Sequence, residues 1–80
     1  MADKAQCLRV LGELNTLKMI GALDKDEFTE LTLLLRKGML QEGFLSVVKK
    51  RLTIISRNKK ESQPQFAKSV EQVAEGIAVH

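Results

Sequence analysis

The chain has 80 residues, a formal net charge of +3 and one cysteine, Cys7. A chain of this length forms one domain and buries only about 60% of its unfolded surface, so its core is marginal by itself. A single cysteine cannot form an internal disulfide, and the only histidine is His80, so neither a disulfide nor a metal site is expected to support the core. Good helix packing or self-association is the remaining source of stability.

Composition also bounds the environment of the protein. Apolar residues make up 44% of the chain, which is too many for a disordered protein. No run approaches the roughly 18 apolar residues that a membrane span requires, and no signal peptide opens the chain. We therefore expect a cytoplasmic protein that makes no membrane contact.

The first predicted helix begins after Asp3, a good N-cap, and ends at Gly21. Its apolar residues recur at the spacing of one helix face: Cys7, Val10, Leu14 and Leu17. Glycine readily adopts the left-handed conformation found just past a helix end, so Gly21 is a predicted structural turn. Cys7 lies on the apolar stripe, which indicates a buried structural thiol rather than a nucleophile.

The second predicted helix begins at Asp24 and ends at Gly38. Asp24 and Glu27 form a capping box, in which each side chain accepts a hydrogen bond from the backbone of the other residue. Gly38 follows two basic residues, whose charges suit the negative end of a helix, and is a second predicted structural turn. Residues 39–40 are then expected to form a short apolar turn.

The third predicted helix starts at 41–42 and ends at 57–58. One of its faces is the predicted core face, formed by Phe44, Leu45, Val48, Leu52 and Ile55. Val47 and Ile54 form a smaller apolar ridge beside that face.

The third helix also carries a block of positive charge, with no acidic residue between Phe44 and Lys60. The block comprises Lys49, Lys50, Arg51, Arg57, Lys59 and Lys60. Such a block predicts a basic surface that contacts phosphates or an acidic partner. A solvated helix face explains the same pattern and is the interpretation we favour.

A polar segment and a fourth helix complete the chain. Residues 59–64 are polar and predict a linker. Ser62 and Gln65 form a second predicted capping box, with Pro64 in the first helical turn, where its missing N–H costs nothing. The helix that follows is expected to dock, on its own chain or on a partner, through one apolar stripe: Phe66, Val70, Val73 and Ile77.

The periodicity is helical throughout, and no segment shows the alternation of a strand. We therefore predict an all-α fold in which three helices form short antiparallel hairpins and a C-terminal fourth helix follows the polar linker. The expected organisation is a three-helix domain with two similar helix-turn segments over residues 1–58, a linker over 59–64 and an amphipathic helix over 65–80.

One phrase spans the first predicted turn: Leu-x-x-Leu-x-x-x-Gly-x-Leu-x-x-x-x-Phe, formed by Leu14, Leu17, Gly21, Leu23 and Phe28. A looser copy follows at Leu31, Leu34, Gly38 and Leu40. Over residues 14–52 the chain resembles the SHOCT module, a short two-helix element often found at the C-termini of bacterial proteins. The resemblance implies a role in interaction or oligomerisation rather than in chemistry.

The second predicted helix is apolar on most of its circumference. Phe28, Leu31 and Leu35 share one face, Leu34 flanks that stripe, and Leu33 lies roughly opposite. Either the fourth helix covers the second face or a partner does, and we favour a partner. The predicted partner-binding residues are Leu33, Leu34, Val47 and Ile54.

No pair of residues combines a nucleophile with a base, and no glycine-rich loop follows a strand, so we expect no catalytic residue, no cofactor and no small-molecule substrate. The sequence predicts a small non-catalytic helical protein that binds another protein as a regulator, inhibitor or antirepressor, a profile typical of small phage and plasmid proteins, and that self-associates as a homodimer. The alternative is a small basic nucleic-acid-binding dimer that uses the third helix.

Overall fold

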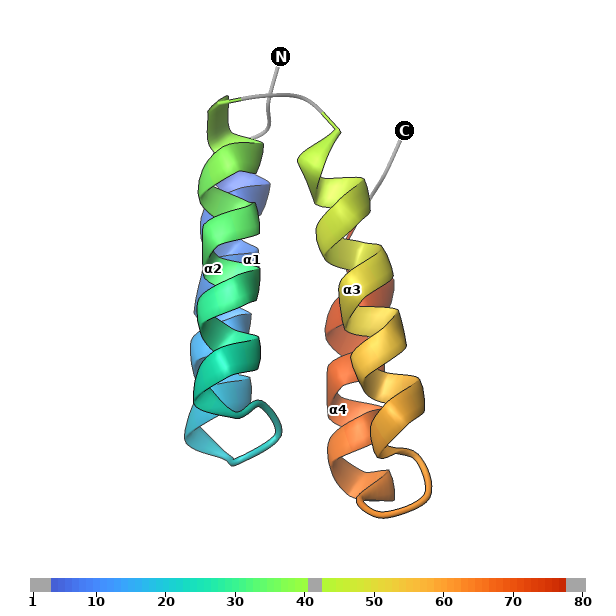
Figure 1. Ribbon diagram of the computed structural model, residues 1–80. Coiled ribbons are helices and arrows are strands. Elements are labelled where there is room, and N and C mark those ends of the chain that lie inside the picture. The colour runs from blue at the N-terminus through green and yellow to red at the C-terminus, as the bar shows by residue number, and fades with distance from the viewer. Residues whose placement is uncertain (1–3, 41–42, 78–80) are drawn as a thin grey trace.

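The computed structural model describes residues 4–40 and 43–77 and contains four helices, with no strand in those ranges. They are α1 (Lys4–Met19), α2 (Lys25–Leu40), α3 (Phe44–Lys59) and α4 (Pro64–Glu75). Figure 1 shows α1 behind α2 and α4 behind α3, so that two antiparallel helix pairs stand side by side. The all-α prediction is confirmed. The expected N-cap Asp3 and the expected start of the third helix at 41–42 lie outside the described residues.

All four helices contribute to one core. Its buried residues lie on the inward-facing sides of the helices, in the turn after α1 or just after α4: Cys7, Val10, Leu14, Leu17, Ala22, Leu23, Leu31, Leu35, Val48, Leu52, Ile55, Val70, Ala74 and Ile77. The predicted burial of Cys7 is confirmed. The expected stripe of α4 docks on its own chain, because Val70 and Ile77 are buried and Phe66 and Val73 pack half-buried against the same cluster.

The turn after α1 follows from Gly21. Its φ of 87° lies in the left-handed region, as predicted from the sequence. The Gly21 N–H donates to Lys18 O at 3.1 Å, and the Ala22 N–H donates to Leu17 O at 2.8 Å. This is the Schellman arrangement, and it brings the buried residues Leu17 and Ala22 together beneath the turn. The chain therefore reverses direction while the carbonyls of Leu17 and Lys18, in the last turn of the helix, keep hydrogen-bond partners.

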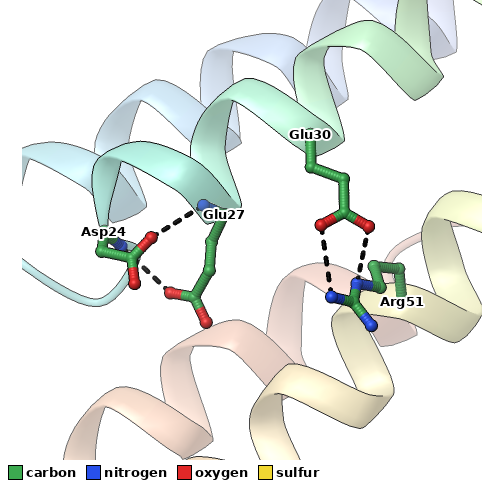
Figure 2. A network of polar contacts seen from close by, with 4 residues as sticks. All are labelled: Asp24, Glu27, Glu30 and Arg51. Atoms are coloured by element: carbon green, nitrogen blue, oxygen red, sulfur yellow. Dashed lines mark hydrogen bonds and ion pairs between the residues drawn. The ribbon is translucent and has the colours of Figure 1, made fainter.

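The capping box at the start of α2 is present. The Glu27 N–H donates to Asp24 Oδ1 at 2.7 Å, and the Asp24 N–H donates to Glu27 Oε1 at 3.0 Å (Figure 2). Each side chain satisfies a backbone donor that the first helical turn leaves without a partner. Asp24 is thus the structural turn residue that the sequence predicted.

The prediction that Gly38 ends the second helix is wrong. α2 continues through Gly38 and ends at Leu40, so the expected apolar turn at residues 39–40 is helical. A glycine inside a helix costs only about 1 kcal/mol, which packing on neighbouring helices offsets. The added turn gives α2 the 16 residues that α1 and α3 also have. The left-handed glycine in this region is Gly43, the N-cap of α3, with a φ of 95°.

The connection between α3 and α4 is shorter than the expected linker. α3 includes Lys59 and α4 begins at Pro64, so only residues 60–63 lie between them. The N-cap of α4 is Gln63 and has no side-chain hydrogen bond, so the capping box expected at Ser62 is wrong, whereas Pro64 occupies the first turn as predicted. The Gln63 N–H donates to Lys59 O at 2.7 Å, which ties the connection to the end of α3.

A buried hydroxyl joins α3 to α4. Ser56 is a buried polar residue, and its Oγ donates to Ala67 O at 2.8 Å. A serine without a partner in that position would carry a desolvation penalty, so the bond fixes how the two helices meet. The fourth helix is therefore part of the same folded unit as the first three.

Candidate functional site

Three large apolar side chains are exposed on the side of α2 and α3 that faces away from α1 and α4. Leu33 is 52% exposed, Val47 45% and Ile54 44%. Leu33 lies two residues from both Leu31 and Leu35, about 200° around the helix, so the packing that buries those two leucines turns Leu33 outward. Val47 and Ile54 lie two turns apart on one side of α3. We call this side of the two helices the outer face.

Charged residues share the outer face with these apolar side chains. On α2, residues spaced three and four apart form one stripe: Asp26, Glu30, Leu33 and Lys37. On α3, the corresponding stripe alternates apolar and basic residues: Val47, Lys50, Ile54 and Arg57. All eight side chains are exposed. The outer face therefore has apolar positions bordered by two acids and one base on α2 and by bases alone on α3.

An ion pair closes the seam between the two helices. Arg51 Nε lies 2.9 Å from Glu30 Oε1, and Arg51 Nη2 donates to Glu30 Oε2 at 3.2 Å. Figure 2 shows two nitrogens of the Arg51 guanidinium, from α3, opposite the two carboxylate oxygens of Glu30, from α2. The side chains are 40% and 47% exposed, so water screens the pair and its energetic contribution is small. Its structural value is that it places Glu30 and Arg51 at the same height along the two antiparallel helices.

The six basic residues predicted to contact phosphate or an acidic partner divide into two sets. Arg51 pairs with Glu30, Lys59 Nζ lies 3.1 Å from Glu27 Oε1, and Lys49 Nζ donates to Ile77 O at 3.2 Å. These three hold α3 against α2 and against the segment that follows α4. The other three are exposed: Lys50, Arg57 and Lys60. The basic block is thus half structural, which the sequence pattern did not show.

The structure bears on two hypotheses about the apolar face of α2. Leu34 was predicted to bind a partner, but it packs half-buried against the core, because it lies on the side of α2 that faces α3. The fourth helix was considered as a cover for Leu33, but α4 packs against α3 and, less closely, against α1, and Leu33 stays exposed. Leu33, Val47 and Ile54 remain as the apolar part of the predicted contact surface.

A second set of exposed apolar residues lies on α1 and was not predicted. Leu8 is 60% exposed, and Met19 and Ile20 are exposed near the end of the helix. Ile20 borders an open groove of about 360 Å³ between α1 and α4, where Glu13 Oε2 is buried without a hydrogen-bond partner among the described residues. The signal for this side was present in the sequence, since Leu8 and Ile20 fall outside the buried spacing of α1. The hydroxyls of Thr16 and Ser69, which line the groove, each donate a hydrogen bond to a backbone carbonyl of their own helix. The groove therefore offers few free donors.

The described part of the chain contains no cluster of side chains that could bind a metal ion. Within residues 4–40 and 43–77, no three side chains of metal-binding type lie close together. No helix in the same ranges is long and apolar enough to cross a membrane. The outer face is the surface on which exposed apolar side chains of two neighbouring helices, α2 and α3, lie together with exposed charges.

Comparison of the chain with known proteins finds no matching family model, no similar curated protein and no similar solved structure. The resemblance to the SHOCT module over residues 14–52 accordingly stays a prediction. The fold and the outer face are the observations from which function has to be argued.

Proposed function

We propose that this protein is a small non-catalytic helical regulator that acts by binding another protein through the outer face of α2 and α3, and that it self-associates. The observation that carries the proposal is the exposure of Leu33, Val47 and Ile54 on one side of a helix pair whose other side is buried. An inhibitor or antirepressor, which works by occupying the surface of a partner, needs such a contact surface and no catalytic group.

Energetics favour a covered outer face. Removing a Leu, Ile or Val side chain from water contributes about 1.5–3 kcal/mol, and each of these three side chains still exposes about half of its surface. Single exposed apolar residues are ordinary on protein surfaces, but three on one face, bordered by charges, have the composition of an interaction site. The charged border, Glu30 with Arg51 and the neighbouring Lys50, suits the polar rim of such a site.

The alternative function is nucleic-acid binding by α3. Lys50, Arg57 and Lys60 are exposed and lie on a helix without acids, which supports contact with phosphates. Arg51 and Lys59 are paired with the carboxylates of α2, which reduces the positive potential that a nucleic acid would meet. We therefore rank this function second.

Binding measurements on matched variants test the proposal. The immobilised chain is used to capture a partner from its host, and the purified partner is then titrated against wild type, Leu33→Asp and Leu8→Asp. A carboxylate buried at an interface without a partner costs several kcal/mol, so Leu33→Asp is expected to weaken binding at least about a hundredfold. Leu8→Asp places the same change on an exposed leucine of α1 and is expected to bind normally. Circular dichroism checks that both variants are folded.

The same titration separates the two functions. A Lys50→Glu/Arg57→Glu variant that loses binding beside a folded Leu33→Asp variant that keeps it would contradict the proposal. Affinity that falls steeply with salt in that case would favour the nucleic-acid function, because phosphate contacts release counterions.

A further inference from the structure

The charges of the outer face are divided between its two helices. The first half of α2 presents Asp26 and Glu30, with Lys37 near the end of the helix, whereas α3 presents Lys50 and Arg57 and carries no acidic residue from Phe44 to Lys60. A surface that holds an acidic strip beside a basic strip complements a copy of itself, provided that the acidic strip of each copy meets the basic strip of the other.

The Glu30–Arg51 ion pair fixes the heights of these residues along the helix axes. With a rise of about 1.5 Å per residue in antiparallel helices, Leu33 and Val47 lie about 4.5 Å and about 6 Å to the same side of that pair. Asp26 and Arg57 lie about 6 Å and about 9 Å to the other side, and Lys50 is within about 2 Å of the height of Glu30. Asp26, Glu30 and Leu33 therefore each have a complementary position on the α3 stripe within about 3 Å of their own height, whereas Lys37 lies beyond Val47 and has none.

We propose that a second copy of the chain covers the outer face, in a dimer whose two-fold axis runs parallel to the helices. The inference rests on the proposed function, because it assigns an occupant to the same surface. Rotation about such an axis leaves the position of each residue along the helix direction unchanged. It sets α2 of each copy against α3 of the other. Asp26 then faces Arg57 of the second copy, Glu30 faces Lys50, and Leu33 faces Val47, and every contact occurs twice.

Charge selects this axis over the other two-fold arrangement. An axis perpendicular to the helices, in the plane of the interface, would place α3 on α3 and α2 on α2. The exposed bases Lys50 and Arg57 would then face a helix that has no acid, and such like-charge contacts oppose association.

The size of the outer face agrees with a dimer that dissociates readily. Two helices of 16 residues are about 24 Å long and about 10 Å wide each, so the two copies together bury on the order of 1,000 Å². This is the lower limit of a specific interface, so we expect the association to be weak and readily reversible. A foreign partner would then compete with the second copy for the same surface.

Charge-reversal variants and sedimentation equilibrium test the arrangement. Asp26→Lys alone and Arg57→Glu alone are each expected to raise the dimer dissociation constant about tenfold, because each turns two attractive contacts into repulsive ones. Asp26→Lys combined with Arg57→Glu in one chain is expected to restore the wild-type constant, and an equimolar mixture of the two single variants is expected to form the heterodimer. Lys68→Glu, an exposed reversal on α4, is the matched control and is expected to change nothing.

Three results would overturn the inference. A wild-type chain that stays monomeric at millimolar concentration has no second copy on this face. A double variant that associates no better than the single variants excludes the parallel axis, and an Arg57→Glu variant that associates more tightly than wild type indicates the perpendicular one. None of these results decides whether a foreign protein binds the outer face, which the Leu33→Asp titration measures separately.

Discussion

The inner and outer sides of α2 and α3 carry similar residues with opposite surroundings. Leu31 and Leu35 are buried in the core shared by all four helices, whereas Leu33, between them in the sequence, is half exposed. On α3, Val48 is buried and its neighbour Val47 is exposed. The inner side forms the core, whereas the outer side stays exposed and is the side that we propose for contact. Substitutions on the two sides should therefore have different kinds of effect.

The largest expected difference is between two leucines of α2. Leu31→Ala leaves a cavity in the core and is expected to lower the free energy of unfolding by about 2–5 kcal/mol. Leu33→Ala removes an exposed side chain and is expected to change it by less than about 0.5 kcal/mol. Urea denaturation of dilute samples, in which association is negligible, measures both. Equal losses for the two variants would contradict the division into an inner and an outer side.

Two glycines extend the comparison from side chains to the backbone. Gly21 holds a left-handed turn, so Gly21→Ala is expected to cost about 1–2 kcal/mol. An added Cβ would lie 3.7 Å from Phe66 Cζ, an ordinary contact, so the cost comes from φ and not from crowding. Gly38 lies inside α2, so Gly38→Ala is expected to stabilise the protein by about 0.5–1 kcal/mol. Thermal unfolding of both variants checks the two signs, and a loss of stability in Gly38→Ala would count against a continuous α2.

A polar pair sharpens the same comparison on a smaller scale. Ser56 is buried and bonds to Ala67 O on another helix, so Ser56→Ala is expected to cost about 0.5–1.5 kcal/mol. Ser69 bonds to Gln65 O within its own helix and is more exposed, so Ser69→Ala serves as the control and is expected to be near neutral. Equal shifts of the denaturation midpoint for the two variants would mean that the Ser56–Ala67 hydrogen bond between α3 and α4 contributes no more to stability than the bond of Ser69 within its own helix.

The smallest effect is expected at the ion pair on the outer seam. Glu30→Gln is expected to cost about 0–1 kcal/mol at low salt and less at high salt, because both partners are partly exposed. Glu27→Gln should cost more, since it removes the charge opposite Lys59, whose side chain is largely buried, although the glutamine oxygen can still accept the capping bond from the Asp24 N–H. Unfolding at two ionic strengths measures both variants, and the reverse ranking would contradict the assigned roles.

The parts of the fold that depend on local chemistry were predictable from the sequence. The helical period identified the buried stripe of α1 and, in part, that of α4, where Val70 was predicted but the buried Ala67 and Ala74 were not. The left-handed turn followed from Gly21, and the capping box followed from Asp24 and Glu27. The end of α2 was not predictable in this way. A glycine weakens a helix by only about 1 kcal/mol without ending it, so Gly38 by itself does not fix where α2 ends.

The candidate surface was predictable only in part, for a geometric reason. Leu33 and Leu34 differ by about 100° around α2, and both fall outside the main buried stripe. The position of α3 decides that Leu34 packs inward and Leu33 outward, and the position of a neighbouring helix is not encoded in the period of one helix. The partners of Lys49, Arg51 and Lys59 likewise come from other segments of the chain, so a run of bases could not show which charges were already paired.

Backbone amide chemical shifts in a dilution series test the central claim most directly, because they locate contact on the unmodified chain. Between about 10 µM and about 1 mM, a range that covers weak association, the amides around Leu33, Val47 and Ile54 are expected to shift with concentration. Those of Leu8 and Ile20 are expected to stay constant. Shifts confined to Leu8 and Ile20, or no shift at the outer face up to the highest concentration, would contradict the account.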